Sequence, residues 1–414
     1  FSPVLIVVLA SAIPLMIFPQ PAAKAVMSAR TFIMDNFLWL YLVAGLSALA
    51  FCMWLAFGRY GNVKLGQADE EPEYSNIHWI AMMFTAAIGA SVIAWGFAEP
   101  IFYIQTPPFN FTPGSHEAFE WAHVYPMLHW GIIPWAIYAL PAVPIAYMLY
   151  VREYPVLRIS SAGDGALPTK GRDKLKTGID ILIVLGIVGG VATTLGLGVP
   201  LVSAMIATLF EVEDSMLIKI SVLAFWTALF GTSVYKGLKA GIKILADINV
   251  VLAIFAILFV LIGGPGVFIL DLTVNSFGLM FSNFMSTATW TDPIREGDFP
   301  EAWTGFYWAW WFAYTGMVGL FFGRISRGRT IRQLVLGVIT WGCIGTWLFL
   351  AVMGGYSLFL EKTGALAITE ILNSQGMSFL NALVIKSLPF GKITLAIFTV
   401  LSIIFYATTI DSSA

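Results

Sequence analysis

Long runs of apolar residues alternate with short polar connections along the whole chain. Roughly ten of these runs are long enough to cross a bilayer, for which an α-helix needs about 20 residues. They cover residues 1–18, 37–57, 77–104, 123–150, 178–209, 216–233, 244–264, 303–322, 333–360 and 392–414. The first run lacks the basic segment of a secretory signal peptide, so we interpret it as a span. The pattern predicts an all-α, multi-pass membrane protein with a single transmembrane domain over residues 1–414.

Basic residues gather in alternate connections between these runs. The loop after the second run contains Arg59 and Lys64, and the loop after the eighth run contains a cluster from Arg324 to Arg332. The loops after the fourth and sixth runs are also basic. The remaining loops are acidic, as at Glu211. Because cytoplasmic loops are enriched in Lys and Arg, this alternation predicts that the basic loops and the N-terminus face the cytoplasm.

A longer connection over residues 265–302 interrupts the alternation. Its apolar residues, among them Phe277 and Met280, recur at helical spacing between polar positions, which is typical of an amphipathic helix at a membrane surface. We interpret it as a periplasmic connector between two halves. On this interpretation residues 1–57 form two leading helices, residues 77–264 form a first repeat of five spans, and residues 303–414 begin a second repeat.

Small residues interrupt two apolar runs that occupy matching places in these halves. The third run contains the sequence AAIGAS from Ala86 to Ser91, and the eighth contains Gly316 and Gly319. Unwound helices at matching places indicate a transporter's midplane binding site, because unwinding frees backbone carbonyls and helix ends for ligands. Close packing of helices through small residues is the alternative explanation.

Composition agrees with a membrane protein and gives no candidate for catalysis. Of 414 residues, 58% are hydrophobic and 11% charged, and the mean hydropathy is +0.83. The net charge of −2 gives no reason to expect a nucleic-acid partner. Cys52 and Cys343 lie inside apolar runs, where neither a disulfide framework nor a zinc site is expected. The sequence contains no recognisable nucleophile with a base, phosphate loop or metal cluster, so we predict neither an enzyme nor an organic cofactor.

Aromatic residues are concentrated at membrane depth in the fourth and eighth spans. In the eighth span they recur every three or four residues, which places them along one side of a helix. The residues concerned are Trp130, Trp135 and Tyr138 in the fourth span and Trp303, Tyr307, Trp310, Trp311 and Tyr314 in the eighth. Aromatic rings are common at membrane interfaces, but Trp310, Trp311 and Tyr314 lie about 10–16 Å further along the helix, near the midplane. We therefore predict that they face a cavity.

An aromatic enclosure with few fixed charges suits a quaternary ammonium. Such a cation cannot donate a hydrogen bond and is held mainly by the faces of aromatic rings, at up to about 2 kcal/mol for each desolvated contact. A primary amine or a metal cation would instead require an acidic partner. The membrane-embedded Glu99 and His129 are interpreted as structurally paired groups, because neither is clearly central in its span.

The tenth span carries a possible sodium site. The hydroxyl groups of Thr408 and Thr409, placed opposite free carbonyls near Thr85 and Ile88 in the interrupted third span, would provide the hard oxygen ligands that sodium prefers. Threonines in membrane helices also bond to their own backbone, and both interpretations remain open at this point.

Four motifs resemble the betaine/choline/carnitine transporter family. They are HWGIIPWAIYALP at 129–141, WTGFYWAWW at 303–311, GRISRGRTIR at 323–332 and ATTIDSS at 407–413, while TPPF at 106–109 and TDPI at 291–294 resemble the carnitine/γ-butyrobetaine exchanger. The resemblance covers essentially the whole chain. It implies a LeuT-like fold of inverted five-helix repeats preceded by two helices, a homotrimer, and transport of trimethylammonium compounds. The family has twelve spans, so the second repeat is expected to be truncated in this chain.

The resemblance also implies roles for particular residues. The substrate path would be lined by Trp130, Trp135, Tyr138, Trp310, Trp311 and Tyr314. The sodium ligands would be Thr408 and Thr409 together with the carbonyls of Thr85, Ile88 and Phe405. Ser91 stands where choline transporters have Asp, which disfavours choline. The sodium-independent exchanger has an arginine where this chain has Asn249, and it lacks the threonine pair, so sodium coupling is favoured over exchange.

We therefore predict a secondary transporter of the bacterial inner membrane. It would import a small onium solute, such as glycine betaine, carnitine, trimethylamine N-oxide or a sulfonium analogue, together with sodium, by alternating access around the aromatic cage. Membrane lipid is the other expected partner. A precursor/product antiporter of the carnitine/γ-butyrobetaine type is the alternative within this class. An onium-gated channel is the alternative from another class, but it would need a polar pore with charged or carbonyl rings.

Overall fold

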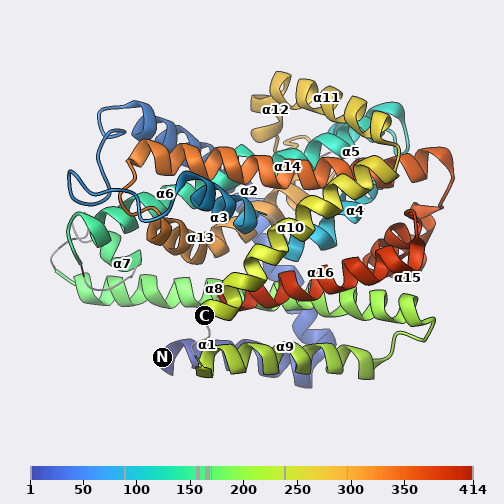
Figure 1. Cartoon of the computed structure of the whole chain (residues 1–414), viewed down its shortest axis with the longest axis horizontal. Coiled ribbons are helices and arrows are strands. Elements are labelled where there is room, and N and C mark those ends of the chain that lie inside the picture. The colour runs from blue at the N-terminus through green and yellow to red at the C-terminus, as the bar shows by residue number, and fades with distance from the viewer. Residues whose placement is uncertain are drawn as a thin grey trace. The chain divides into compact units, whose positions relative to one another are not determined.

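The computed structural model describes residues 2–87, 90–154, 159–163, 168, 170–236, 239–295 and 297–412, and over these ranges the chain is helical with no strand. The predicted all-α class is therefore confirmed (Figure 1). The elements in chain order are α1 (Ser2–Ile17), α2 (Pro19–Phe57), α3 (Asn76–Ala87), α4 (Ala90–Gln105), η1 (Pro108–Asn110), α5 (His116–His129), α6 (Ile132–Tyr150), α7 (Ile159–Ala162), α8 (Arg172–Phe210), α9 (Met216–Lys236), α10 (Lys239–Gly263), α11 (Gly266–Ser282), α12 (Phe284–Ala288), η2 (Pro300–Thr304), α13 (Gly305–Ile325), α14 (Ile331–Thr363), α15 (Ile368–Lys386) and α16 (Gly391–Ser412).

Several helical stretches are suited to a bilayer by length and apolarity. Four meet both criteria among the described residues, namely Pro19–Phe57, His116–Tyr150, Arg172–Phe210 and Ile331–Thr363. The pair Val250–Gly263 and Gly266–Ser282, bent by 109°, would make a fifth. Shorter apolar helices cover Leu5–Ile17, Met216–Leu229 and Gly391–Ala407. Helices therefore occupy all ten predicted runs, although fewer than ten pass the length and apolarity criteria.

Two expectations about individual spans need correction. The second span was expected to begin near residue 37, but α2 extends back to Pro19, because the alanine-rich stretch after its N-terminal prolines also favours a helix. The eighth span was expected to be interrupted at Gly316 and Gly319, yet α13 runs without a break from Gly305 to Ile325. At Gly319, an added Cβ would lie 2.7 Å from Pro141 Cγ of α6, so this glycine permits close packing.

The chain divides into two compact units. Unit one contains Phe1–Met83, Ile132–Gly190 and Met285–Trp341, and unit two contains Phe84–Gly131, Val191–Phe284 and Gly342–Ala414. Each unit combines parts of both predicted repeats, so the inverted-repeat organisation stays a prediction.

Unit one has a core of α2, α6 and α13, and these helices pack closely where one of them carries a small residue. An added Cβ at Gly45 of α2 would lie 2.6 Å from Trp308 Nε1 and 2.8 Å from Ile133. Gly190 at the end of this unit's part of α8 similarly leaves room for the ring of Tyr314. Trp308, which faces α2, is fully buried. These contacts fix which faces of α13 point toward α2, α6 and α8.

One end of unit one is closed by a pairing of two loops. The backbone of Leu65 bonds to that of Arg329 and Gly328 in both directions, and Ile331 N–H donates to the carbonyl of Val63. Arg324 pairs with Glu73 at 3.0 Å and Arg327 with Glu70 at 2.5 Å. The arginine cluster therefore has a structural role in joining these loops.

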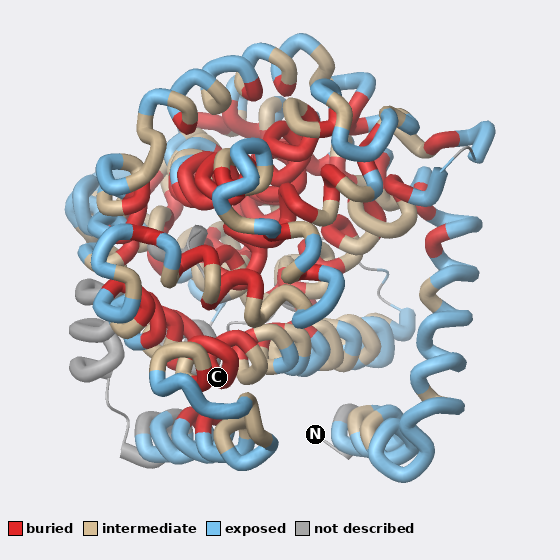
Figure 2. Tube along the Cα trace, turned by 90° about the vertical axis from the view of Figure 1, so that its right-hand side faces the viewer, coloured by how far each residue is buried: buried red, intermediate tan, exposed pale blue. Residues whose placement is uncertain are grey.

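Unit two packs α4 against α5 and α15. Asn381 of α15 is fully buried, and its Nδ2 donates to the carbonyl of Ala94 at 2.8 Å. His123 of α5 is also buried and bridges Ser276 of α11 and the carbonyl of Ala351 at 2.7 and 3.0 Å. The first helix of unit one, α1, exposes large apolar residues such as Met16 and Ile17, as the pale blue trace near the N-terminus in Figure 2 shows. Such surfaces suit contact with lipid.

Candidate functional site

Five of the six predicted substrate-path residues form one aromatic cluster in unit one. On α13, Trp310 and Trp311 stack with ring centroids 5.2 Å apart and an interplanar angle of 6°, and Tyr314 meets Trp310 edge-on at 6.3 Å. On α6, Trp135 and Tyr138 pack edge to face at 5.6 Å. Tyr138 meets Trp311 edge to face at 6.0 Å, which joins the two helices.

The cluster is buried inside unit one. Trp135, Tyr138, Trp310, Trp311 and Tyr314 are each less than one tenth exposed in the structure. Helical spacing on α13 places Trp310, Trp311 and Tyr314 together, and the facing turn of α6 supplies the other two rings. The rings therefore do not point outward as an interfacial belt would.

Tyr307 belongs to the same cluster, although it was not among the predicted substrate-path residues. Its fully buried ring stacks on Trp310 at 6.1 Å and on Trp311 at 5.7 Å. The helical periodicity of the aromatic stripe included this residue, but the family motif did not single it out. Nearby, Thr315 Oγ1 donates to the carbonyl of Ile137 at 2.8 Å, which ties α13 to α6 beside the rings.

Trp130, the sixth predicted residue, lies in unit two at the C-terminal end of α5. Its indole Nε1 donates to Glu99 Oε2 of α4 at 3.0 Å. Its carbonyl accepts from Thr346 Oγ1 of α14 at 2.7 Å. The indole and the backbone of Trp130 are therefore both held by named partners within this unit.

Glu99 is the centre of a buried polar network in unit two. Its Oε1 accepts from the Tyr103 hydroxyl at 2.6 Å, and the same hydroxyl lies 2.9 Å from His129 Nδ1. Glu99 and His129 are both fully buried, with Oε1 and Nδ1 3.6 Å apart. Because the Tyr103 proton points to Glu99, its oxygen is left to accept from a protonated Nδ1 of His129. The structural pairing expected for Glu99 and His129 is therefore present.

Most of the predicted sodium ligands lie outside the described part of the structure. Ile88 and the side chains of Thr408 and Thr409 are not described, whereas the backbone of Thr85 lies in α3 and Phe405 on α16 is buried. Within the described residues, no group of three or more His, Cys, Asp or Glu could hold a metal ion. A site made of hydroxyls and carbonyls has a different composition, so the sodium site stays a prediction.

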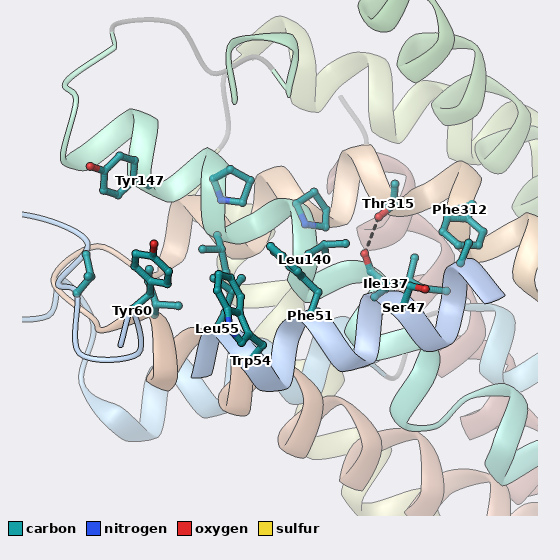
Figure 3. A pocket seen from close by; sticks show the side chains of 17 residues that line it. Ser47, Phe51, Trp54, Leu55, Tyr60, Ile137, Leu140, Tyr147, Phe312 and Thr315 are labelled. Atoms are coloured by element: carbon teal, nitrogen blue, oxygen red, sulfur yellow. Dashed lines mark hydrogen bonds between the residues drawn. The ribbon is translucent and has the colours of Figure 1, made fainter. Parts of the chain in front are cut away.

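A second feature of unit one was not anticipated from the sequence. An almost entirely apolar groove with a volume of about 1100 Å³ runs between α2 and α6 (Figure 3). Aromatic and aliphatic side chains such as Phe51, Trp54 and Leu140 line it, and Tyr60 and Tyr147 lie at one end. Sequence periodicity could not reveal this groove, because it depends on how α2 and α6 diverge.

Comparison with known proteins gives a consistent match over the whole chain. A family model described as "BCCT, betaine/carnitine/choline family transporter" matches residues 1–414. The chain is 34% identical over 400 residues to the glycine betaine transporter OpuD of Bacillus subtilis, covering 96% of this chain and 77% of that protein. It is 31% identical over 408 residues to a carnitine transporter of Acinetobacter baumannii, covering 99% and 74%. The uncharacterized transporter YeaV of Escherichia coli is 33% identical over 372 residues, covering 89% and 76%.

Proposed function

Because the chain belongs to the betaine/carnitine/choline family of transporters, we propose that it moves a small onium compatible solute across a membrane by alternating access. It is a membrane transporter of the betaine/carnitine type and not an enzyme. Glycine betaine, carnitine, trimethylamine N-oxide and sulfonium analogues share a methylated cationic head. The aromatic cluster of unit one is proposed to bind that head.

The observation that carries this proposal is the joining of Trp311, Trp310 and Tyr138 into one buried cluster. Buried ring faces attract a methylated cation because their quadrupoles present negative charge. None of these side chains carries a formal charge, so a primary amine would lack the carboxylate it normally requires. This ring chemistry favours a quaternary head over a primary ammonium group.

The proposed role of each residue follows from its place. Trp310, Trp311 and Tyr314 of α13 and Trp135 and Tyr138 of α6 would contact the head group. Trp130 is proposed as a further substrate-path residue on the strength of its motif at 129–141. A bacterial inner membrane, a cytoplasmic N-terminus, a LeuT-like fold and a homotrimer are parts of the same proposal.

Sodium coupling is proposed for the energy source. The support is the motif at 407–413, where Thr408 and Thr409 resemble the threonine pair of sodium-coupled betaine transporters. Exchange of one onium compound for another, without sodium, is the alternative, since one of the relatives above is a carnitine transporter.

Uptake by proteoliposomes tests the proposal directly. Radiolabelled glycine betaine, carnitine, trimethylamine N-oxide and a sulfonium analogue would be offered with an inward sodium gradient, with no sodium, and with unlabelled solute preloaded. We expect saturable uptake of at least one solute that depends on the sodium gradient. Uptake that requires preloading and ignores sodium would support the antiporter instead. A lack of binding and uptake for all four solutes would overturn the proposed function.

A further inference from the structure

The apolar groove of unit one is open along α2, and the five clustered rings are not among the residues that line it. Its lining includes Phe51 and Trp54, which are 48% and 50% exposed in the structure. The opposite wall comes from α6, with Leu140, Pro141 and Pro144. Prolines keep this wall free of long flexible side chains, so the groove stays open along the helix. An elongated hydrocarbon chain matches this shape and polarity.

Tyr60 and Tyr147 lie at one end of the groove (Figure 3), and each has an arginine beside its ring. The guanidinium carbon of Arg59 lies 4.8 Å from the centre of the Tyr60 ring, and that of Arg152 lies 5.9 Å from the centre of the Tyr147 ring. Both arginines are exposed. Each cation is therefore placed over a ring that itself lines the groove.

These two arginines differ from the other arginines at this end of unit one. Arg324 and Arg327 pair with glutamates, Arg329 donates to Asn76 Oδ1 and to the carbonyl of Tyr74, and Arg332 donates to the carbonyl of Ala56. Arg59 donates to the hydroxyl of Tyr60, at 2.6 Å. Across the residues that the structure describes, neither Arg59 nor Arg152 meets a carboxylate.

The neighbouring carboxylate at this end is already used. Glu153 follows Arg152 in the chain, and its Oε1 accepts from Gln67 Nε2 at 3.1 Å. Within the described residues, the mouth of the groove therefore presents two guanidinium groups that pair with no carboxylate. Guanidinium groups bind phosphate through paired hydrogen bonds, so an anionic phosphate is the complementary group.

We infer that the groove binds an anionic phospholipid, with an acyl chain along Phe51, Trp54 and Leu140 and the phosphate between Arg59 and Arg152. The mouth lies at the end of α2 that the distribution of basic residues predicts to face the cytoplasm. Anionic lipids are enriched in that leaflet, and basic residues near its surface attract them. Trp54 also suits the boundary between headgroups and hydrocarbon.

Lipid retention measured by native mass spectrometry tests this inference without any transport assay. The purified protein would be equilibrated in mixed micelles containing equal amounts of phosphatidylglycerol and phosphatidylcholine. We expect the unmodified protein to retain at least tenfold more phosphatidylglycerol than phosphatidylcholine. The double variant Arg59→Gln and Arg152→Gln should lose that preference. Arg295→Gln, at an exposed arginine elsewhere in unit one, is the matched control and should keep it.

A second variant tests the apolar part of the site while keeping both arginines. Ser47 is exposed and lines the groove, so Ser47→Trp would fill the end away from Tyr60. We expect it to reduce phosphatidylglycerol retention severalfold. Equal retention of both lipids by the unmodified protein, or retention unaffected by the arginine and groove variants, would overturn the inference. So would a change of oligomeric state in Ser47→Trp with lipid retention intact, since the groove would then be covered by a second copy.

Discussion

Trp311 is the residue on which the proposed binding of a methylated head most depends. Its ring contacts Tyr307 and Trp310 on α13 and Tyr138 on α6, so it joins the rings of the two helices. Replacement by Leu keeps an apolar group of similar burial but removes the ring face. Losing one desolvated cation–π contact of about 2 kcal/mol corresponds to roughly thirtyfold weaker binding.

The variant Trp311→Leu is accordingly expected to weaken onium binding by about that factor while the protein still folds. Isothermal titration with the best solute of the uptake panel measures the affinity, and gel filtration checks the fold. Trp39→Leu is the matched control, because Trp39 is 57% exposed on α2, outside the cluster. Unchanged affinity in Trp311→Leu would contradict a cage built around this ring.

Glu99 illustrates how a buried carboxylate can position an aromatic ring. Oε2 accepts from the Trp130 indole while Oε1 accepts from Tyr103, so both oxygens are used. Leaving a buried hydrogen-bond donor without its acceptor costs about 1–3 kcal/mol. The orientation of the Trp130 indole is therefore expected to depend on the acceptor at position 99.

A double-mutant cycle isolates this dependence. Glu99→Gln keeps one of the two oxygen acceptors and is expected to weaken solute binding a few fold, whereas Glu99→Leu keeps neither and should weaken it at least tenfold. Trp130→Phe removes the indole donor, so in that background Glu99→Gln should have no further effect on affinity. Additive effects of the two substitutions would show that Glu99 does not act through Trp130.

The sequence predicted these residues unevenly. Ring identity and helical spacing were sufficient to select Trp310, Trp311 and Tyr314, because a stripe on one helix is a local property. Tyr103 follows Glu99 by four residues on α4, a spacing that places the two side chains on one face, but the contact of Tyr103 with His129 needs α4 and α5 to be packed together. The sodium ligands remain a prediction, since the hydroxyls of Thr408 and Thr409 lie outside the described side chains.

Among the helices, the contact of α13 with α6 sets the geometry of the cluster. Gly319 makes it possible, since an added Cβ would lie 2.7 Å from Pro141 Cγ and 3.1 Å from its Cβ. A proline ring cannot swing away as a flexible side chain can. The two helices would have to separate to accommodate a larger residue.

Gly319→Val is therefore expected to destabilise unit one by about 1–3 kcal/mol, the usual cost of overpacking. The thermal midpoint in detergent measures the change. Gly178→Ala on α8 is the matched control, because nothing lies within 4 Å of its added Cβ. That change should be neutral or stabilise by up to about 1 kcal/mol through the better helix propensity of alanine. Equal midpoints for the two variants would contradict the close contact.

In unit two, an ion pair connects the loop after α8 to the start of α16. Glu211 and Lys392 are 2.7 Å apart, and the hydrogen bond from Lys392 lowers the pKa of Glu211 below its usual value of 4.5. A lowered folded-state pKa means that the stabilisation is present above the unfolded pKa and is lost as the pH falls through the folded value. Both groups are largely exposed, so solvent weakens the effect.

Amide hydrogen exchange at the end of α8 should therefore increase modestly when the pH falls below about 4, where Asp and Glu carboxylates become protonated. After correction for intrinsic exchange rates, Lys392→Met should exchange faster than the unmodified protein at neutral pH, and its exchange should increase less when the pH falls. Lys362→Met is the control, since Lys362 lies over Phe268 and its replacement leaves the Glu211 pair intact. The same acid response in Lys392→Met as in the unmodified protein would contradict the pairing.

At the level of elements, the apolar pattern predicted where helices occur but was less successful in predicting whether each helix is continuous. All ten predicted runs contain helix, because burial of apolar surface and helix propensity agree there. The expected interruption of α13 at Gly316 and Gly319 was wrong, because a glycine that allows close packing and a glycine that breaks a helix look alike in sequence. The end of the seventh run at residue 264 agrees with the bend of 109° between α10 and α11, which end and begin at Gly263 and Gly266.

For the whole molecule, accumulation of a solute against its gradient requires a coupled energy source. The family assignment establishes a transporter but leaves the coupling ion as a proposal. The predicted repeats and the two compact units divide the chain differently, since each unit takes segments from both repeats. That difference is expected if long helices such as α8 and α14, which each contribute to both units, are the continuous elements of the fold.

Sodium dependence gives the decisive test at this scale. If Thr409 supplies a hydroxyl ligand, Thr409→Ala should raise the sodium concentration for half-maximal uptake at least tenfold, because a hard cation loses one of few oxygen ligands. Thr399→Ala on the same helix is the matched control, since the Thr399 hydroxyl is committed to the Leu395 carbonyl at 2.7 Å. Its sodium dependence should stay within about twofold of the unmodified protein. Equal uptake with and without sodium in the unmodified protein would instead require exchange of onium compounds as the driving reaction.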